Sequence, residues 1–372
     1  MMKTVVLGVC GSIAAVRAFD VVRLLRMKGF NIQVLMSKGA EGIITKDAME
    51  WASGNPVITK ITGKVEHVKF FGKKGIGDLM LIAPATANTI SKIAMAIDDT
   101  PITTFATIAI GSKKPVLIAP AMHEPMYEHP IVQKNLELLE REKRIKIIEP
   151  LVEEEKAKIA PLEKIVLEVE RALGKKKLEG KKVLVGNGAT YSAIDPMRII
   201  TNLSSGKMGK ALEHELFVNG ASVSIIEGTE HKKFYSQIMK ELSKGFDYFV
   251  LPAAINDFEA KKQNNKISSS EKINLELVPT KKLLEEVQKK FPNLKIIAFK
   301  AETNKSKKEL EKIGKDFLAK NKIEMVVVND IAKNPAGSDK SEMLIVSKRK
   351  TVLVNGAKEK IAQKISEEIG KI

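Results

Sequence analysis

The chain has little cysteine, few aromatic residues and no long apolar segment. A single cysteine in 372 residues excludes a disulfide framework and any metal site built from several thiolates. No apolar run is long enough to cross a bilayer, and the first residues lack the pattern of a signal peptide. From these absences we expect a cytoplasmic protein with no membrane-spanning segment.

The charge is strongly positive, but the usual marks of a nucleic-acid-binding protein are missing. The 62 Lys and Arg residues outnumber the 45 Asp and Glu residues, which gives a formal net charge of +17. The basic residues are dispersed along the chain, aromatic residues make up 5% of it, and no DNA- or RNA-binding motif is present. We therefore interpret the positive field as attraction for small anionic ligands rather than for nucleic acid.

Strand-like and helix-like segments alternate over most of the chain, which is typical of parallel sheets covered by helices. The length favours two domains, and a polar, glycine-flanked stretch is followed directly by a new strand-like segment. We expect an α/β protein of two doubly wound parallel-sheet domains, residues 1–174 and 183–372, joined by a linker at 175–182. The predicted strands are 4–9, 32–36, 79–83, 116–119, 183–185, 223–226, 249–251, 296–299 and 325–328, and the predicted helices are 14–28, 131–142, 163–173, 209–219, 283–289 and 307–321.

A loop of small and hydroxyl residues precedes the predicted helix near the middle of the chain. It runs Asn202-Leu203-Ser204-Ser205-Gly206-Lys207-Met208-Gly209, shortly after Asp195-Pro196-Met197-Arg198. Free backbone N–H groups and the helix dipole favour an anion at such a position, and Gly206 allows its close approach. The loop lacks the spacing of a Walker A motif. A plain helix with Ser204 or Ser205 as its N-cap explains the same residues, so the pattern alone leaves both interpretations open.

A second loop of the same kind follows the first predicted strand. The sequence Gly8-Val9-Cys10-Gly11-Ser12-Ile13 leads from this strand into a helix, and such a turn can hold a phosphate on backbone amides. It is not the dinucleotide-binding fingerprint, because the G-x-G-x-x-G spacing is absent. Each loop follows the first strand of its own domain, where ligands of open sheets bind, so we expect two active sites.

Other predicted strands also end in small or polar residues. The residues concerned are Thr86, Asn88, Met122, His123, Ala253, Ala254 and Asp257. Asp257 suits a ribose hydroxyl or a magnesium ion, and Lys266 lies in a polar loop beyond it. His67 is one of five histidines and hence a candidate general base. Helix caps, solvated loops and a packed histidine explain these residues equally well when each is taken alone.

Taken together and in this order, the motifs resemble the bifunctional phosphopantothenoylcysteine decarboxylase / phosphopantothenate–cysteine ligase family of coenzyme A synthesis, over nearly the full length. On the decarboxylase side the resemblance rests on Gly11-Ser12-Ile13-Ala14, His67, Pro84-Ala85-Thr86-Ala87-Asn88-Thr89, Pro120-Ala121-Met122 and Met126-Tyr127. On the ligase side it rests on Asp195-Pro196-Met197-Arg198, Asn202, Ser204-Ser205-Gly206-Lys207-Met208-Gly209, Ala253-Ala254, Lys266, Phe299-Lys300-Ala301-Glu302-Thr303 and Asn329-Asp330.

For the first domain, the resemblance implies a flavodoxin-like flavoprotein that binds FMN and forms trimers. His67 would act as the catalytic base while the flavin oxidises the cysteine moiety, which makes loss of CO₂ easy. The same resemblance implies an FMN site formed by Gly11, Ser12, Ile13, Ser37, Thr86, Asn88 and Met122.

For the second domain, the resemblance implies a Rossmann-like dimer that uses CTP and Mg²⁺. It would join phosphopantothenate to cysteine through an acyl-cytidylate, with Asn202 contacting this intermediate and Lys266 offsetting charge on the reacting phosphate. The implied nucleotide site comprises Ser204, Ser205, Gly206, Ala253, Ala254, Asp257, Lys266 and Phe299, with Asp257 also as the metal ligand. The implied partners are small anionic substrates, with no membrane and no nucleic acid.

The chain departs from the family pattern at three places. His123 stands where an asparagine usually follows Pro-Ala-Met, and residues 186–190 replace a more typical Gly-Pro-Thr start. The family also carries a cysteine in a mobile clamp near the end of the decarboxylase domain, whereas residues 153–161 contain none. Our hypothesis is that Lys156 or Lys158 supplies the proton instead.

Three alternatives remain open on the sequence. The first is a non-enzymatic flavin-binding regulator with a vestigial ligase half, since relatives of the flavodoxin-like domain include inhibitory subunits. The other two are a flavin-dependent enzyme for a different substrate and a nucleic-acid-binding protein driven by the +17 charge.

Overall fold

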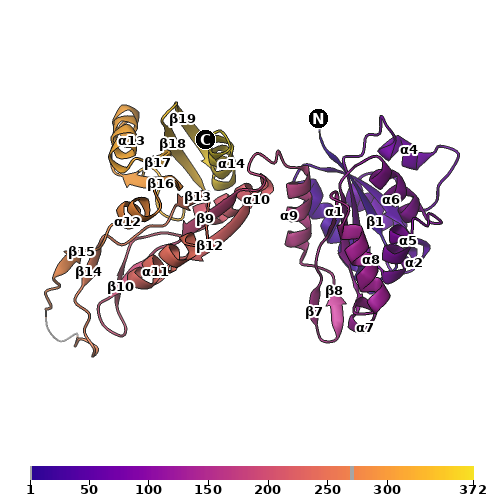
Figure 1. Ribbon diagram of the computed structural model, residues 1–372, viewed down its shortest axis with the longest axis horizontal. Coiled ribbons are helices and arrows are strands. Elements are labelled where there is room, and N and C mark those ends of the chain that lie inside the picture. The colour runs from indigo at the N-terminus through magenta and orange to yellow at the C-terminus, as the bar shows by residue number, and fades with distance from the viewer. Residues whose placement is uncertain (1, 269–271) are drawn as a thin grey trace. The chain divides into compact units, whose positions relative to one another are not determined.

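The computed structural model describes residues 2–268 and 272–372, and the chain forms two compact units, Met1–Gly174 and Lys175–Ile372 (Figure 1). The segment 175–182, expected as a linker, is anchored in the second unit. Leu178 is buried in the core of that unit, and its N–H donates to the Asn219 carbonyl at 2.9 Å. Within the described residues, no helix combines the length and the apolar character needed to span a bilayer.

The first unit is built on a five-stranded parallel sheet. Its strands, in spatial order, are β2 (Asn31–Met36), β1 (Thr4–Val9), β3 (Leu79–Ala85), β4 (Val116–Pro120) and β6 (Ile145–Ile147). Successive side chains of a strand point to opposite faces, so Val5 and Leu7 enter one hydrophobic core while Val6 enters the other. Burial on both faces explains why these strands are continuous apolar runs.

Helices cover both faces of this sheet, which confirms the doubly wound arrangement. One core contains residues of η1 (Ile13–Arg17), α1 (Ala18–Met27), α3 (Lys46–Ser53) and α9 (Leu162–Leu173), and the other contains residues of α4 (Glu66–Phe71), α5 (Ala87–Ala94), α6 (Pro101–Gly111) and α8 (Pro130–Glu140). Short helices α2 (Lys38–Glu41) and α7 (Glu124–Tyr127) follow β2 and the short strand β5 (Met122–His123).

A small antiparallel sheet lies at the end of the first unit. Strand β8 (Lys156–Lys158) pairs with both β5 (Met122–His123) and β7 (Leu151–Glu153). The β7–β8 turn places Glu154 and Glu155 at φ of 51° and 58°. Such two-residue turns normally carry Asn or Gly, and the absence of that signal explains why the sequence did not predict this hairpin.

The second unit is built on a seven-stranded sheet, with five parallel strands and an antiparallel edge. In spatial order the strands are β12 (Ser222–Glu227), β9 (Lys182–Asn187), β13 (Tyr248–Leu251), β16 (Lys295–Glu302), β17 (Met325–Asp330), β18 (Lys340–Ser347) and β19 (Thr351–Ala357). The parallel strands match the predicted ones. The antiparallel pair β18–β19 was not predicted, because residues 348–350, which join the two strands, are all basic and give no turn signal.

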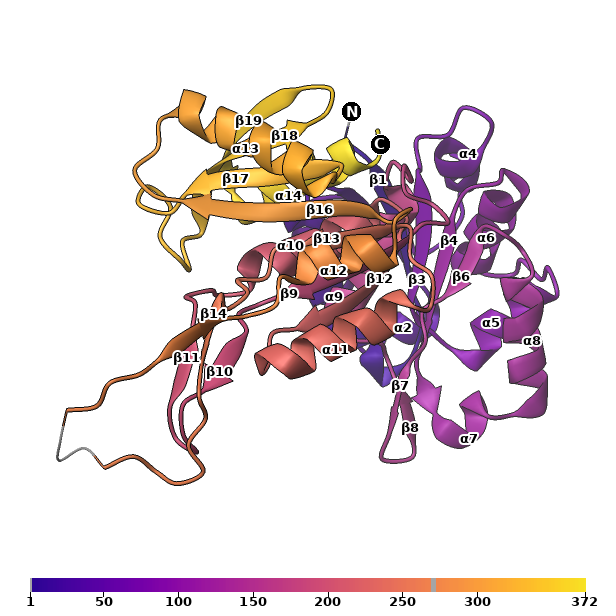
Figure 2. The same cartoon turned by 60° about the vertical axis from the view of Figure 1, so that its left-hand side comes forward.

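Helices again cover both faces of the second sheet. One core takes residues from α10 (Lys207–Val218) and α14 (Lys358–Ile369), and the other from α11 (His231–Leu242), α12 (Leu283–Lys290) and α13 (Lys307–Asn321). The side of the sheet covered by α11, α12 and α13 faces the viewer in Figure 2. Helices α10 and α14 pack against each other, so their first residues, Lys207 and Lys358, are both available to one site.

Two hairpins project from the second unit and are called the arm below. They are β10–β11 (Tyr191–Ala193 and Ile199–Thr201) and β14–β15 (Phe258–Ala260 and Leu277–Pro279), and they lie beside each other in Figure 2. The buried side chain of Asn256 joins them: its Nδ2 donates to the Phe258 carbonyl at 2.6 Å and to Ser192 Oγ at 3.2 Å. Its N–H donates to Thr190 Oγ1 at 2.8 Å, which fixes the base of the arm.

Replacing this residue tests its part in holding the arm. Asn256→Ala leaves buried acceptors without a donor, so we expect a loss of about 1–3 kcal/mol in stability. Hydrogen exchange should accelerate at residues 258–260, and thermal unfolding should begin earlier. Asn355→Ala, at an exposed position of β19, is the control. Equal stability of the two variants would contradict the assignment.

Candidate active sites

Three hydroxyl side chains follow three neighbouring strands of the first sheet. Ser12, Ser37 and Thr86 are the N-caps of η1, α2 and α5, the helices that follow β1, β2 and β3. The spatial order β2-β1-β3 brings the three helix starts to one edge of the sheet. Free backbone N–H groups at these starts favour an anion, so this edge can bind a phosphate group.

At this edge of the sheet, the loop after β1 and the start of α2 pack closely against each other. A Cβ atom on Gly11 would lie 2.8 Å from the backbone of Gly39, so only glycine fits there without moving the chain. Ile13 follows with its side chain 79% exposed, beside the three hydroxyl residues. Asn88 is exposed in the first turn of α5. The predicted residues Gly11, Ser12, Ile13, Ser37, Thr86 and Asn88 therefore lie on the loops of adjacent strands.

His67 is the second residue of α4, and one of its ring nitrogens makes no hydrogen bond within the described residues. Its ring meets Phe105 edge-on, with the centroids 6.4 Å apart, and its Nδ1 is buried with no hydrogen-bond partner in the described part of the chain. A buried polar atom without a partner is unfavourable unless a ligand or water completes it. This observation supports a functional use of the side chain.

The small sheet of the first unit brings together two of the departures from the family pattern. His123 of β5 lies opposite Lys156 of β8, and Met122 lies opposite Ala157. Ala157 is buried and Met122 packs on the core, so His123 and Lys156 share the other face. Lys158 is paired with Glu154 at 2.8 Å, and this hydrogen bond raises the pKa of the Lys158 ammonium group.

The second unit contains a cavity of about 1070 Å³ at the carboxyl ends of β9, β13, β16 and β17. Eight predicted residues line it: Asn202, Ser204, Ser205, Gly206, Ala253, Ala254, Asp257 and Phe299. Lys266 is not among the lining residues, since it lies between β14 and β15 in the arm. The structure therefore joins the separate strand-end motifs into one site but leaves Lys266 on a neighbouring segment.

The start of α10 forms one wall of the cavity. Its N-cap is Gly206, at a φ of 69°, and no side chain caps the helix, which differs from the alternative of a Ser204 or Ser205 cap. In the described part of the chain, Ser204 Oγ accepts a hydrogen bond from the Gly206 N–H at 3.3 Å, and Ser205 Oγ accepts one from the Lys207 N–H at 3.4 Å. The uncapped helix start retains the electrostatic character of an anion site.

Lysines supply the positive charge of the cavity. Those that line it are Lys207, Lys281, Lys282, Lys300, Lys320 and Lys358. Lys207 and Lys300 belong to motifs named from the sequence, whereas the other four come from separate segments that no motif indicates. Their number suits a ligand with several phosphates.

The role of Asp257 as a metal ligand stays a prediction. Its carboxylate is paired with Lys282 Nζ at 2.6 Å, and the described residues contain no group of three His, Cys, Asp or Glu side chains able to hold a metal ion. A magnesium ion in proteins commonly uses one or two carboxylates together with substrate phosphates. Asp257 would therefore hold such an ion only together with the phosphates of a bound nucleotide.

Asp195 connects the arm to the loop that carries Lys266. Its buried carboxylate accepts hydrogen bonds from the N–H groups of Met197 (2.7 Å), Arg198 (2.8 Å) and Ile267 (3.1 Å) and is paired with the Arg198 guanidinium. Arg198 also donates to the Ile267 carbonyl at 3.0 Å. Burial alone would raise the pKa of Asp195, but these donors outweigh it and lower the pKa to about 2.

Comparison with known proteins places both units in one family. A model of the Flavoprotein family matches residues 1–174, and a model of the DNA/pantothenate metabolism flavoprotein C-terminal domain matches residues 178–372. The coenzyme A biosynthesis bifunctional protein CoaBC of Thermococcus kodakarensis is 42% identical over 388 positions, covering 100% of this chain and 95% of that protein. The chain belongs to the CoaBC family.

A second CoaBC relative agrees with this. The CoaBC of Methanocaldococcus jannaschii is 36% identical, covering 100% of this chain and 94% of that protein. A solved DNA/pantothenate metabolism flavoprotein from Streptococcus pneumoniae covers 52% of this chain and 99% of its own, with 25% identity and a TM-score of 0.47. As a CoaBC protein, the chain is a bifunctional enzyme of coenzyme A biosynthesis with decarboxylase and ligase activities. Both halves match, so the alternative of a regulator with a vestigial ligase half has no support.

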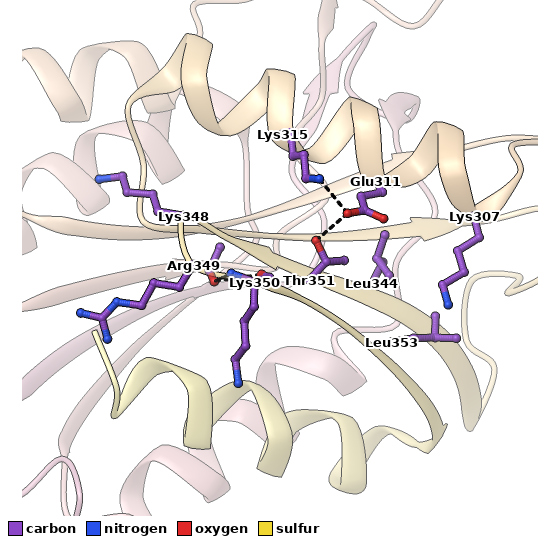
Figure 3. Close-up of a pocket in the computed structure, with 10 residues that line it drawn as sticks. Lys307, Glu311, Lys315, Leu344, Lys348, Arg349, Lys350, Thr351 and Leu353 are labelled. Atoms are coloured by element: carbon purple, nitrogen blue, oxygen red, sulfur yellow. Dashed lines mark hydrogen bonds and ion pairs between the residues drawn. The ribbon is translucent and has the colours of Figure 1, made fainter.

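A second depression of this CoaBC protein, about 530 Å³ in volume, lies between α13 and the β18–β19 hairpin (Figure 3). Its lining is basic, but several of its cations have acidic partners: Lys315 with Glu311 (2.8 Å), Lys348 with Glu324 (2.8 Å) and Lys350 with Glu368 (2.9 Å). It contains none of the predicted site residues. We therefore assign no ligand to it.

The close approach at Gly11 gives a test of the first site. Gly11→Ala forces the loops after β1 and β2 apart, so we expect flavin to bind at least about tenfold more weakly, equivalent to about 1.4 kcal/mol. Flavin content after purification and titration of the flavin-free protein with FMN measure this. Gly42→Ala is a matched control, because its Cβ would lie 3.8 Å from the nearest atom. Unchanged flavin affinity in Gly11→Ala would refute the assignment.

The low pKa of Asp195 gives a pH-dependent test. Its folded pKa of about 2 lies below the ordinary 3.8, so the charged carboxylate stabilises the arm above pH 3.8, and this is lost as the pH falls through about 2. Asp195→Asn should therefore be less stable at neutral pH, with a difference that shrinks in acid. Urea unfolding at several pH values measures it, with exposed Asp316→Asn as the control. A difference that does not vary with pH would count against this role.

Proposed function

We propose that the second unit condenses phosphopantothenate with cysteine at the expense of CTP, and that the first unit decarboxylates the product, phosphopantothenoylcysteine, with FMN. The observation that carries this proposal is the basic cavity of the second unit. Residues from five separate motifs, among them Asn202, Gly206 and Phe299, meet there around an uncapped helix start. A site of this kind suits a nucleoside triphosphate and a second anionic substrate.

In the ligase reaction, the start of α10 and the surrounding lysines hold the triphosphate and offset its charge. The carboxylate of phosphopantothenate attacks the α-phosphate of CTP, which releases pyrophosphate and forms the acyl-cytidylate. The amine of cysteine then attacks the acyl carbon, which releases CMP. Asn202 would contact the acyl group; in support, it lines the cavity, and its Nδ2 donates to the Ile255 carbonyl at 2.8 Å. Lys266 would bring a further positive charge to the phosphates. It lies in the arm next to Ile267, whose N–H donates to the Asp195 carboxylate.

In the decarboxylase reaction, Ser12, Ser37 and Thr86 with the adjoining helix starts would hold the phosphate of FMN. When bound, FMN supplies the oxidation and later reduction that make loss of CO₂ from the cysteine moiety possible. The unpartnered Nδ1 of His67 is the atom available to accept a proton from the substrate. Phe105 packs on the ring and restricts its orientation.

For the returning proton we favour Lys156 over Lys158. The ammonium group of Lys158 is hydrogen-bonded to Glu154, which raises its pKa and makes it a poorer acid. Lys156 is exposed on the same face as His123, opposite it in the β5–β8 ladder. Both residues depart from the family pattern, and we propose that they act together on the carboxylate side of the substrate.

Exposed apolar residues support the proposed assembly through both units. On the arm these are Ile199, Phe258, Leu277 and Val278, at 51%, 47%, 45% and 43% exposure. On the first unit, Ile13 and Trp51 are 79% and 69% exposed. Large exposed apolar side chains are frequent at protein interfaces, which is in keeping with a dimer through the ligase unit and a trimer through the flavin unit. The single, buried cysteine supports a reducing, cytoplasmic location.

Mass spectrometry of the products formed from phosphopantothenate, cysteine and CTP tests the whole proposal. The natural protein should release pyrophosphate, CMP, CO₂ and phosphopantetheine. His67→Gln should stop at phosphopantothenoylcysteine, because only the second step needs the base. Lys266→Ala should reduce pyrophosphate release by about 100-fold or more, within the range for loss of one transition-state contact.

Matched controls separate these roles from general effects. Lys262→Ala changes an exposed lysine of the same segment as Lys266 and should retain both activities. Lys156→Ala should accumulate the enethiol, whereas Lys158→Ala should not. Pyrophosphate release that does not require all three substrates would disprove the ligase assignment.

A further inference from the structure

Lys358 lines the ligase cavity from the first position of α14. Lys207, at the first position of α10, lines the same cavity, and neither helix start has a side-chain cap. A lysine at a helix N-terminus is unfavourable for folding, because the dipole there is already positive. Two such lysines at neighbouring helix starts therefore point to a requirement other than stability.

The two lysines differ in how their charges are satisfied. Lys207 is paired with Asp339 and also donates to the Gly337 carbonyl at 3.1 Å. Lys358 is half-buried, and its Nζ donates to the hydroxyl of Ser341 at 2.7 Å, with no acidic partner among the residues that the structure describes. Burial, and after it the charge of Lys207, lowers the pKa of the Lys358 ammonium group. A bound anion would stabilise the charged form of this half-buried ammonium group.

Asn187 gives independent support for a ligand at this wall of the cavity. It is 2% exposed, and its Oδ1 has no hydrogen-bond partner in the described chain, while its Nδ2 donates to Glu227 at 2.9 Å. The amide packs against the first turn of α10, so closely that a Cβ on Gly209 would lie 1.9 Å from Oδ1. An unpaired buried acceptor calls for a donor, and a phosphate ester that carries hydroxyl groups brings both donor and anion.

We propose that Lys358 is a phosphate-binding residue of the ligase site, contacting a substrate phosphate at the starts of α10 and α14. The inference rests on the proposed ligase function and adds to it a residue that none of the sequence motifs contains. The phosphate has two possible sources, the triphosphate of CTP and the phosphate of phosphopantothenate. Both offer charged oxygens to an ammonium group, and the experiment below distinguishes them.

The test compares Lys358→Ala and Lys358→Arg with Lys360→Ala, an exposed lysine two residues along the same helix. Michaelis constants are measured for CTP, phosphopantothenate and cysteine, together with equilibrium binding of CTP alone. Loss of one charge-assisted hydrogen bond weakens binding by about ten- to a hundredfold. In Lys358→Ala we expect the Michaelis constant to rise by this factor for a phosphorylated substrate and to stay unchanged for cysteine. Lys358→Arg should recover most of the lost affinity, and Lys360→Ala should have the constants of the natural protein.

The pattern of effects identifies the source of the phosphate. Weaker binding of CTP alone indicates the triphosphate, whereas an effect confined to the Michaelis constant of phosphopantothenate indicates its phosphate. Decarboxylation of supplied phosphopantothenoylcysteine should not change, because the first unit carries it out, and recovery in Lys358→Arg excludes misfolding of the second unit. Unchanged constants for both phosphorylated substrates, or an equal effect in Lys360→Ala, would overturn the proposal.

Failure of the ligase function itself would be recognised separately. In that case the natural protein would form no CTP-dependent product. Titration with pyrophosphate requires no catalysis, so weaker binding to Lys358→Ala than to the natural protein would still support the phosphate site. Equal binding to both proteins would refute it.

Discussion

The organising constraint of both units is the burial of parallel strands on two faces. In a strand such as β1, where every residue is buried, the side chains after Thr4 are all apolar. Polar groups are therefore confined to the loops, and in a parallel sheet the carboxyl ends of all strands meet at one edge. The helices that follow these loops also begin there and direct free N–H groups at the same space. Both sites of the protein follow from this arrangement.

In the ligase unit, many lysines gather at the carboxyl ends of the strands, and this arrangement is unfavourable for the free energy of folding. The lysines of the cavity come from α10, α13, α14, β16 and the segment just before α12, and Lys207 and Lys358 oppose the dipoles of their own helices. In this cavity, as in the basic depression beside α13, several lysines have acidic partners, among them Lys207, Lys282 and Lys300. The meeting of helix starts and strand ends, rather than the number of lysines, distinguishes the ligase cavity from an ordinary basic surface.

Buried polar side chains hold the flexible parts of the ligase in place. Asn256 fixes the base of the arm through four hydrogen bonds or more, and Asp195 joins the β10–β11 hairpin to Ile267, next to Lys266. A fully satisfied polar network of this kind defines one geometry, because each donor has a specific acceptor. Lys266 is therefore supported by residues of the arm although it lies outside the cavity lining.

The sequence by itself determined the parallel strands other than β6, the helices α1, α8, α9, α10, α12 and α13, the family and the motif residues that line the ligase cavity. These follow from local signals: apolar periodicity, turn residues and the order of short motifs. Only the tertiary structure decided the antiparallel β18–β19 edge, the pairing of Asp257 with Lys282, and the meeting of Lys207 with Lys358. Each depends on contacts between residues distant in the chain, formed when the helices and strands pack. Local pattern places a residue on an element, but its neighbours, and hence its charge state and chemistry, are set by packing.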